Sequence, residues 1–435
     1  MRKKVFLTAA LVLLAALTLR SCFDEPSIKF GIESGNVGTR PFTVEFKGVG
    51  EGLKSIQVSY VGKENTILLE TKQYPEGVEQ DTVSISLNPF SGIEDGPAQI
   101  RATAEAYGGA KIGEPGVSKT IDIVADLSPP KITVISGTEN ITRSGSGVIV
   151  YKVSSDAVES GVKIGDKLFK GYQAAPNAGI SDEEVRIAFF SYPYDMEEGE
   201  TVLVTATDTI GNKRNLPVSY KLKKKPFSKF DIEVTEKFVK MKMLPLVSSS
   251  EKMSLKEVFL LVNKKIRAVN NRKIEEVLSR TEDKIMWEGV FIRPVGELQS
   301  DFEERKYFFN GELIDKQKHL GYDIASQRKN PVRASNSGVV VFSDDLGIYG
   351  NTLIIDHGMG VATLYAHLSG MTVQRGDTVA KGDTIGGTGE TGLAFGDHLH
   401  FGIYIGATPV VPVEWWDSFW VETRITDKIE AARGR

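Results

Sequence analysis

The sequence predicts a mainly β protein with several domains, a helical connector and a C-terminal domain that holds the chemistry. Its 435 residues correspond to two to four domains at roughly 100–200 residues each. The 43 glycines indicate many turns, and apolar residues alternate with polar ones over long stretches, as in half-buried strands. A composition of 41% hydrophobic and 25% charged residues is typical of globular domains and argues against disorder.

Charge, cysteine and histidine content exclude several classes of function. The chain has 53 basic and 57 acidic residues, so no basic field is present and we expect no nucleic-acid binding. One cysteine excludes an intramolecular disulfide framework and a cysteine-rich zinc site. All five histidines lie between His319 and His400, which places the expected chemistry in that region.

Residues 1–22 are predicted to be an export signal or anchor. A basic start is followed by an apolar stretch over residues 5–19, which is short for a bilayer span of about 20 residues. Cys22 follows Leu19-Arg20-Ser21, a pattern that resembles a bacterial lipobox. A lipoprotein, an uncleaved signal anchor and a cleaved signal all remain open. Each predicts an exported chain in the bacterial envelope, facing the periplasm, and the first two tether it to the membrane.

Residues 27–127 are predicted to form a β-sandwich. Phe42, Val44 and Phe46 alternate with polar residues, and a glycine-rich turn over residues 48–52 follows them. Several short strands separated by such turns favour a sandwich. The prolines of Ser128-Pro129-Pro130 mark its boundary.

Residues 131–224 are predicted to form a second sandwich. Val202, Val204 and Ala206 alternate before a turn over residues 207–212. This strand and turn resemble the penultimate strand of bacterial immunoglobulin-like domains, so the resemblance implies an Ig-like fold. We favour a spacer role for both sandwiches, with binding to the cell wall or to a partner as the alternative.

Residues 227–286 are predicted to be a helical connector. Ser254 and Glu257 have capping-box spacing, and Ile274, Val277 and Leu278 suggest a second helix. The first helix has one apolar face, made of Leu255, Val258, Phe259, Val262, Ile266 and Val269. We favour a linker packed on a neighbouring domain, and a gate over the catalytic domain is the alternative.

The domain predicted at residues 290–418, followed by a tail at 419–435, contains three histidine motifs. His319 and Asp323 are four residues apart, and Gly321 between them favours a turn that enters a strand over a helix. Neutral imidazole and carboxylate are both good zinc ligands. His398 and His400 are two apart in a predicted strand, so their side chains share a face. The residues alone do not choose which of the two would bind a metal.

The remaining histidines lie on a predicted hairpin. Tyr365 and His367 are two apart on one strand and are expected to share a face. His357 lies at the turn before that strand, where we expect a structural role.

Taken together, these motifs predict a catalytic zinc site. His319, Asp323 and one of His398 and His400 supply three ligands and leave a position open for water. The remaining histidines are available for acid–base work beside it. Zinc lowers the pKa of a bound water to about 7, so hydroxide becomes available at neutral pH.

From about residue 290 to 417, the chain resembles the lysostaphin/LytM-type peptidoglycan endopeptidases, family 23 of the metallopeptidases. The resemblance rests on His319-x-Gly-x-Asp323, Tyr365-Ala-His367-Leu and Gly396-Asp-His398-Leu-His400-Phe, in that order. It implies that His319, Asp323 and His400 bind zinc and that His367 and His398 are catalytic. One departure is Glu303, where members of the family usually have glycine.

The predicted function is that of a zinc endopeptidase that cuts peptide bonds in peptidoglycan, its expected partner polymer. Two alternatives are a non-catalytic wall-binding regulator of other hydrolases and a zinc carboxypeptidase or amidase acting on the same polymer. Regulators of that kind typically lose ligands, whereas here all five positions are filled. The expected fold is all-β apart from the helical connector.

Overall fold

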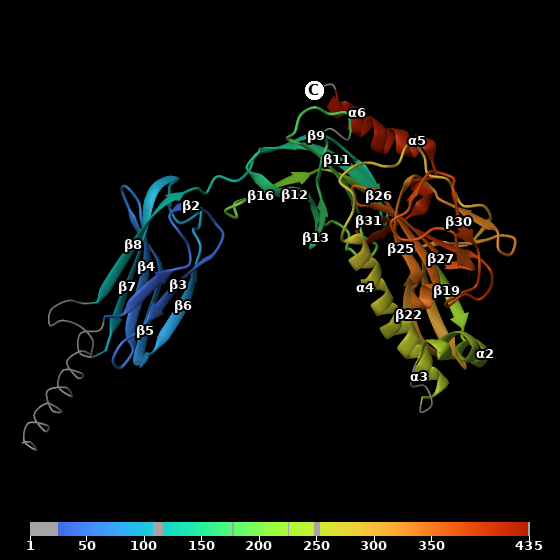
Figure 1. Ribbon diagram of the computed structural model, residues 1–435, viewed down its shortest axis with the longest axis horizontal. Coiled ribbons are helices and arrows are strands. Elements are labelled where there is room, and N and C mark those ends of the chain that lie inside the picture. Colours follow the sequence, from blue (N-terminus) through green and yellow to red (C-terminus); the bar gives the residue numbers. More distant parts are fainter. Residues whose placement is uncertain (1–24, 108–115, 176–177, 225, 248–252, 434–435) are drawn as a thin grey trace, which may run out of the picture. The chain divides into compact units, whose positions relative to one another are not determined.

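The computed structural model describes residues 25–107, 116–175, 178–224, 226–247 and 253–433, which divide into two compact units (Figure 1). Unit 1 comprises residues 1–130 with 207–214, and unit 2 comprises 131–206 with 215–435. The predicted export signal and Cys22 lie outside the described residues. Within the described ranges, no helix has both the length and the apolar character needed to cross a bilayer.

Unit 1 is a β-sandwich of two sheets. Alternation places Phe42, Val44 and Phe46 in its core, as the sequence predicts. One sheet has the order β1-β3-β6 and the other β2-β8-β7-β4-β5. Their strands are β1 (Ser27–Phe30), β2 (Gly35–Val37), β3 (Phe42–Lys47), β4 (Leu53–Val61), β5 (Thr66–Val78), β6 (Gln80–Ile85), β7 (Gly96–Ala106) and β8 (Val117–Ala125).

The middle of the chain forms a second sandwich, whose main sheets have the orders β14-β15-β11-β9 and β13-β12-β16-β17. A short parallel pair, β10-β18, lies beside them. The strands are β9 (Ile132–Gly137), β10 (Asn140–Thr142), β11 (Ser146–Val153), β12 (Ala157–Ile164), β13 (Lys167–Lys170), β14 (Tyr172–Gln173), β15 (Val185–Ser191), β16 (Val202–Asp208), β17 (Lys213–Val218) and β18 (Lys221–Lys223).

The middle sandwich shares its hydrophobic core with the C-terminal domain. Phe189 of β15 lies against Trp287 and Trp415, with ring centroids 6.1 and 6.4 Å apart. The indole N–H of Trp415 also donates to Ser146 Oγ at 3.0 Å. The structure joins residues 131–206 to the domain from residue 287 onward through one buried core, and the spacer role of this sandwich stays a prediction.

The connector starts with a strand, β19 (Ser228–Glu233), which pairs in parallel with β21. The predicted capping box is confirmed, since Ser254 and Glu257 exchange hydrogen bonds at the start of α3. Val269, assigned to the apolar face, is 53% exposed, and the helix runs without a break to Leu278 instead of dividing in two. The helical segments are α2 (Glu236–Phe238), η1 (Val239–Met243), η2 (Leu244–Leu246), α3 (Leu255–Leu260), η4 (Leu261–Ile266) and α4 (Arg267–Leu278).

The C-terminal domain is built on an eight-stranded sheet with the order β20-β23-β31-β27-β26-β25-β29, where β32 pairs with β31. The hairpin β21-β22 continues the sheet of β19, and β24-β30-β28 form a third sheet. The strands are β20 (Glu297–Ser300), β21 (Glu303–Phe309), β22 (Glu312–His319), β23 (Tyr322–Ala325), β24 (Pro331–Arg333), β25 (Gly338–Asp345), β26 (Asn351–Gly358), β27 (Val361–Leu368), β28 (Gly370–Met371), β29 (Thr378–Val379), β30 (Thr384–Gly387), β31 (Leu399–Ile405) and β32 (Thr408–Val410).

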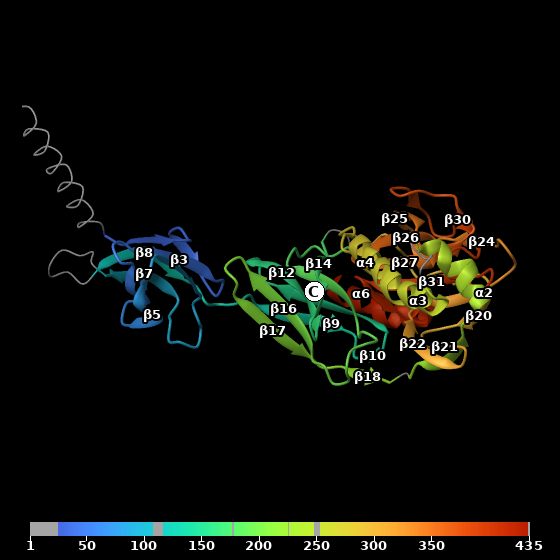
Figure 2. The same ribbon diagram turned by 90° about the horizontal axis from the view of Figure 1, so that it is seen from below.

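The tail is helical. The expectation that the connector is the only helical segment is therefore wrong. Its last helix lies against β9 (Figures 1 and 2), where Ser136 Oγ donates to the carbonyl of Lys428. Arg433 also donates from Nε to the carbonyl of Ala178 at 2.7 Å. The short helices of this domain are η5 (Gly347–Tyr349), η6 (Pro412–Glu414), α5 (Ser418–Val421), η7 (Glu422–Thr426) and α6 (Asp427–Arg433).

The shared core predicts that the middle sandwich and the C-terminal domain unfold together. Phe189→Ala should lower the free energy of unfolding by about 3–5 kcal/mol, because a buried ring is lost and a cavity remains. Denaturant unfolding followed by tryptophan fluorescence measures this. Phe90→Ala is the control, since Phe90 is 94% exposed in unit 1 and its loss should change little. Separate transitions for the two parts of unit 2 would contradict a shared core.

Candidate active site

Three adjacent strands bring the predicted site residues together. Strand β31 lies between β23 and β27, and its His400 is the register partner of both Asp323 and Ala366. His319 ends β22, a strand of the β19-β21-β22 sheet, and only two residues separate it from the start of β23. The motifs are far apart in the sequence and meet because β23, β31 and β27 are neighbours in one sheet.

His319, Asp323 and His400 form a cluster of possible metal ligands. His319 Nε2 lies 3.0 Å from Asp323 Oδ1 and 3.0 Å from His400 Nδ1, and His400 Nδ1 lies 2.9 Å from the same carboxylate oxygen. Donor atoms held 2.0–2.1 Å from a tetrahedral zinc ion would be about 3.3 Å apart. The cluster therefore has the donor types and the spacing that fit one metal ion.

Local structure holds His319 and His400 in these positions. His319 Nδ1 lies 2.8 Å from the carbonyl oxygen of Asp301, which can only accept, so Nδ1 carries the proton and Nε2 presents a lone pair to the cluster. Gly321 makes room for His400, because a Cβ added there would lie 2.5 Å from the His400 Cε1 atom. The glycine of the first motif is therefore required by packing.

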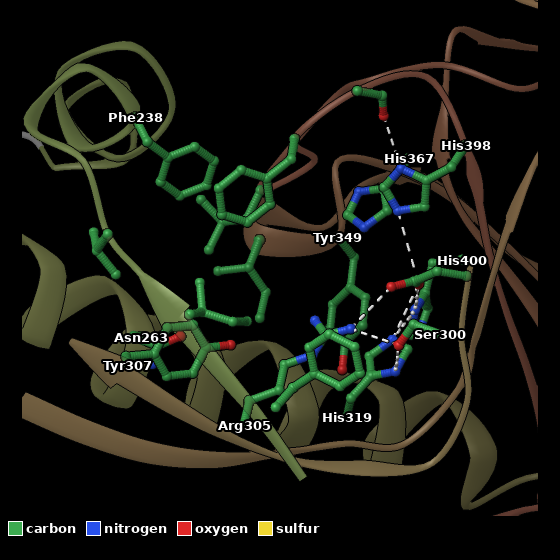
Figure 3. A pocket seen from close by; sticks show the side chains of 18 of the residues that line it. Phe238, Asn263, Ser300, Arg305, Tyr307, His319, Tyr349, His367, His398 and His400 are labelled. Carbon is green, nitrogen blue, oxygen red and sulfur yellow. Dashed lines mark hydrogen bonds and ion pairs between the residues drawn. The ribbon is translucent and has the colours of Figure 1, made fainter. Parts of the chain in front are cut away.

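The rings of His367 and His398 lie beside the cluster and beside each other, as Figure 3 shows. His398 Nε2 is 3.7 Å from Asp323 Oδ1, farther than either proposed ligand. His398 Nδ1 lies 2.7 Å from the carbonyl oxygen of Gly396, and His367 Nδ1 lies 2.8 Å from that of Thr391. Both histidines therefore carry the proton on Nδ1 and leave Nε2 free to exchange protons.

The expectation that Tyr365 and His367 share a strand face is wrong. His367 adopts a φ of 61°, a left-handed conformation that costs free energy for a non-glycine residue. This turns its ring toward His400, with centroids 5.9 Å apart. Tyr365 instead packs in the core on Phe401, and its hydroxyl accepts a hydrogen bond from the Ser335 amide. Such strain at a site residue is typical of functional positions.

The pKa values of the cluster residues favour the binding of a cation. Burial would raise the pKa of the Asp323 carboxyl, but His319 and His400 hold it well below its usual range. Burial lowers the pKa of His400 to about 4, although Asp323 opposes this. Burial, together with His398 and His400, lowers the pKa of His367 to about 3. At neutral pH the Asp323 carboxyl is therefore ionised and the His400 imidazole neutral, which are the protonation states that metal binding requires of these two groups.

Arg305, which the sequence analysis did not single out, contacts the cluster through Asp323. Its Nη2 donates to Asp323 Oδ2 at 3.0 Å and to Ser300 Oγ at 2.9 Å. Its Nε donates to Glu303 Oε1 at 2.5 Å, so the unusual Glu303 is buried and paired. The two-residue spacing of Glu303 and Arg305 is the only signal in the sequence for this pair. In the structure, Glu303 is the register partner of His319.

His357 lies apart from the cluster, in agreement with a structural role. It is fully buried in β26, with Nδ1 2.7 Å from the carbonyl oxygen of Ser337 and Nε2 2.8 Å from Thr363 Oγ1. Burial lowers its pKa to about 4. Its ring packs edge-on against Phe291.

A cavity of about 480 Å³ opens at the cluster, and the connector lines one side of it. Phe238 of α2 stacks on Phe395 of the loop before β31, with ring centroids 4.0 Å apart (Figure 3). Lys242 Nζ also donates to the carbonyl of Glu390 in that loop at 2.6 Å. Connector helices therefore cover part of the groove that leads to the histidines.

Comparisons with known proteins agree on the family of this region. Residues 317–412 match the family model described as peptidase family M23. Over 95 residues the chain is 46% identical to a DD-carboxypeptidase/endopeptidase, Mpg, of Neisseria meningitidis serogroup B, covering 22% of each protein. Over 92 residues it is 39% identical to the peptidoglycan DD-endopeptidase ShyA of Vibrio cholerae, covering 21% of each. The matches thus span about a fifth of these relatives.

Among solved structures, a crystal structure described as a putative peptidase M23 from Pseudomonas aeruginosa is similar to 64% of this chain and 95% of its own. Its sequence identity is 18% and the TM-score is 0.40. The catalytic domain of lysostaphin from Staphylococcus simulans is 27% identical and covers 30% of this chain and 89% of its own, with a TM-score of 0.21.

The Arg305 contacts predict a role in metal affinity. Arg305→Gln should weaken zinc binding roughly 10–100-fold, because Asp323 loses the partner that orients it. Competition with a chromogenic chelator measures the affinity. Arg375→Gln is the control, since Arg375 is an exposed cation of the same domain.

Arg305→Gln also leaves the buried Glu303 carboxylate without its cation, which destabilises the fold by itself. The double variant Glu303→Gln/Arg305→Gln removes both charges. It should recover thermal stability while zinc binding stays weak. Full recovery of zinc affinity in the double variant would contradict the assigned role.

Proposed function

We propose, starting from the M23 peptidase domain at residues 317–412, that this protein is a zinc-dependent endopeptidase that hydrolyses peptide bonds in peptidoglycan. The observation that carries the proposal is the cluster of His319, Asp323 and His400, with two more histidines beside it. Family membership supports peptidase activity, and the relatives named as peptidoglycan endopeptidases support the substrate.

The donor set favours zinc. Two imidazoles and one carboxylate, with a coordination position left open, are the ligand set of catalytic zinc sites. His319 Nε2, His400 Nδ1 and Asp323 Oδ1 would hold the ion. When bound, zinc supplies Lewis-acid activation of a water molecule and of the scissile carbonyl group.

His367 and His398 are proposed to move the protons of the reaction. The Nδ1–H of each is used in a hydrogen bond to a backbone carbonyl, so its Nε2 can accept a proton from water. The same atom can then return the proton to the departing amine. Arg305 keeps Asp323 oriented while this occurs.

A DD-carboxypeptidase activity is a second candidate, because the relatives from Neisseria are named DD-carboxypeptidase/endopeptidase. Products distinguish the two reactions. An endopeptidase converts cross-linked muropeptide dimers into monomers without releasing D-alanine, whereas a carboxypeptidase releases D-alanine from a single stem.

We further propose that the chain is exported and tethered in the cell envelope. The apolar stretch at residues 5–19 and the lipobox-like segment before Cys22 support this. A protein named uncharacterized lipoprotein YgeR from Escherichia coli is 36% identical over 96 residues, which is consistent with such a location.

The proposed roles predict distinct phenotypes for the histidine variants. His400→Ala should purify with little zinc, because it removes a metal donor. His398→Ala and His367→Ala should keep about one zinc ion and lose roughly 10²–10⁴-fold in rate, because proton transfer is impaired. Metal analysis combined with turnover of a defined muropeptide dimer measures both effects.

His357→Ala is the matched control, since His357 is buried away from the cluster and should leave zinc binding intact. Chelation should abolish wild-type activity, and added zinc should restore it. If His398→Ala lost the ion and His400→Ala retained it, the two roles would be reversed. Full activity in every variant would refute the enzyme assignment.

The stacking of Phe238 in the connector on Phe395 in the loop before β31 allows a test of whether the connector limits access to the site. Stacked aromatic pairs contribute about 0.5–1.5 kcal/mol, so Phe238→Ala should raise turnover of large peptidoglycan fragments by up to roughly tenfold if the connector limits access. Phe419→Ala removes an exposed ring elsewhere in the domain and should have no effect. Unchanged turnover in Phe238→Ala would favour a purely structural connector.

A further inference from the structure

A second cavity, of about 640 Å³, also reaches His319 and His400. It is lined by the β21-β22 hairpin, by Arg267 and Asn271 of α4, and by Tyr194 of the middle sandwich. The covered groove described above has apolar and aromatic side chains of the connector along one side, whereas about half of the residues that line this cavity are charged. The metal cluster therefore lies where two chemically different cavities meet.

The cavity carries an excess of positive charge. Its two acidic lining residues are Asp195 and Glu304. Asp195 forms an ion pair with Lys167, which lies outside the cavity. The cations are Lys229, Arg267, Arg305, Lys306, Lys316 and Lys318. Of these, Arg305 is occupied by Glu303 and Asp323. No ion pair joins any of the four lysines to a carboxylate within the described part of the chain.

The hairpin places two of these lysines directly opposite each other. Lys306 of β21 and Lys316 of β22 are register partners, so their side chains leave the same face of the sheet. Like charges in such a pair destabilise a sheet. Asp231 of β19 faces Lys306 from the other side, yet no ion pair connects them. An anionic ligand would relieve this repulsion.

Lys318, two residues farther along β22, is held in place by aromatic rings. Its Nζ lies 5.0 Å from the ring centre of Tyr194 and 5.6 Å from that of Phe227. The ring faces attract the ammonium group and hold it in the cavity. Glu304 of β21 is the register partner of Lys318, and no ion pair joins the two among the described residues. Neighbouring residues of a strand point to opposite faces, yet Lys318 and His319 both line this cavity.

We propose that this cavity binds free carboxylate groups of the substrate peptide. The inference rests on the proposed endopeptidase function and adds a specificity site to it: a stem peptide would lie across the metal cluster with its carboxylates among Lys306, Lys316 and Lys318. Ammonium–carboxylate hydrogen bonds are stronger than neutral ones, and a cleft of one charge sign attracts an oppositely charged substrate. Peptides with amidated carboxylates should therefore be poorer substrates.

The test uses the full exported chain and two synthetic muropeptide dimers, one with free stem carboxylates and one with them amidated. The double variant Lys306→Gln/Lys316→Gln should lower kcat/KM roughly threefold to tenfold on the free-carboxylate dimer, in keeping with partly exposed charge contacts. On the amidated dimer the variant and the wild type should be equal. Raised ionic strength should slow the wild type on the charged dimer only, because salt screens exposed charges.

Lys265→Gln/Arg375→Gln is the matched control, because it also removes two exposed positive charges from unit 2 while leaving the cavity lining unchanged. Zinc content should be the same in all proteins. Removal of the Lys306–Lys316 repulsion should not lower thermal stability, so a loss of rate cannot be attributed to unfolding.

Equal rates on both dimers, with no effect of the double variant or of salt, would overturn the carboxylate site while leaving the endopeptidase intact. An equal loss on both dimers would also overturn it, because the lysines would then act on something other than carboxylates. A wild-type protein that holds zinc and cleaves neither dimer would instead refute the proposed function.

Discussion

The antiparallel pairing of β23 with β31 is the constraint on which the site depends. This register sets Asp323 opposite His400, and the next strand, β27, sets Ala366 opposite His400 from the other side. Because strand side chains alternate, a slip of one residue would turn the whole set to the other face of the sheet. The positions of the possible metal ligands are therefore set by the buried sheet that carries them, in which Phe401 and Tyr365 are fully buried.

The charges of the cluster are stabilised by their surroundings. A buried carboxylate such as Asp323 is costly unless it is paired and hydrogen-bonded. Arg305 supplies the pairing through one carboxylate oxygen and leaves the other oxygen to the histidines. Glu303 balances the charge of Arg305 in turn.

The β21-β22 hairpin separates two kinds of chemistry. Residues of odd number on β21, including Glu303 and Arg305, share one face, and residues of even number, including Lys306, share the other. The first face stabilises the metal cluster, and the second contributes the lysines of the cationic cavity. One short hairpin thus contacts both the proposed metal ligands and the proposed carboxylate site. The connector lines the first cavity and Tyr194 of the middle sandwich lines the second.

The sequence by itself determined the candidate ligands, because His319, Asp323 and the His398–His400 pair have the spacing and side-chain chemistry of a metal site. It also determined the Ser254 capping box, since capping depends only on residues within one helical turn. Strand alternation correctly predicted the core of unit 1, where period-two burial is a local property.

Only the tertiary structure decided the rest, because it depends on residues distant in the chain. Asp323 Oδ1 lies 2.9 Å from His400 Nδ1 and 3.7 Å from His398 Nε2, and this difference, which only the fold reveals, supports His400 as the proposed metal ligand. The left-handed φ of His367 turns its ring to the face opposite to the one that strand alternation predicts, and no local sequence pattern indicates this conformation. Arg305 and the core around Trp415 likewise acquire their roles from partners on other strands, and packing of that kind cannot be deduced from periodicity alone.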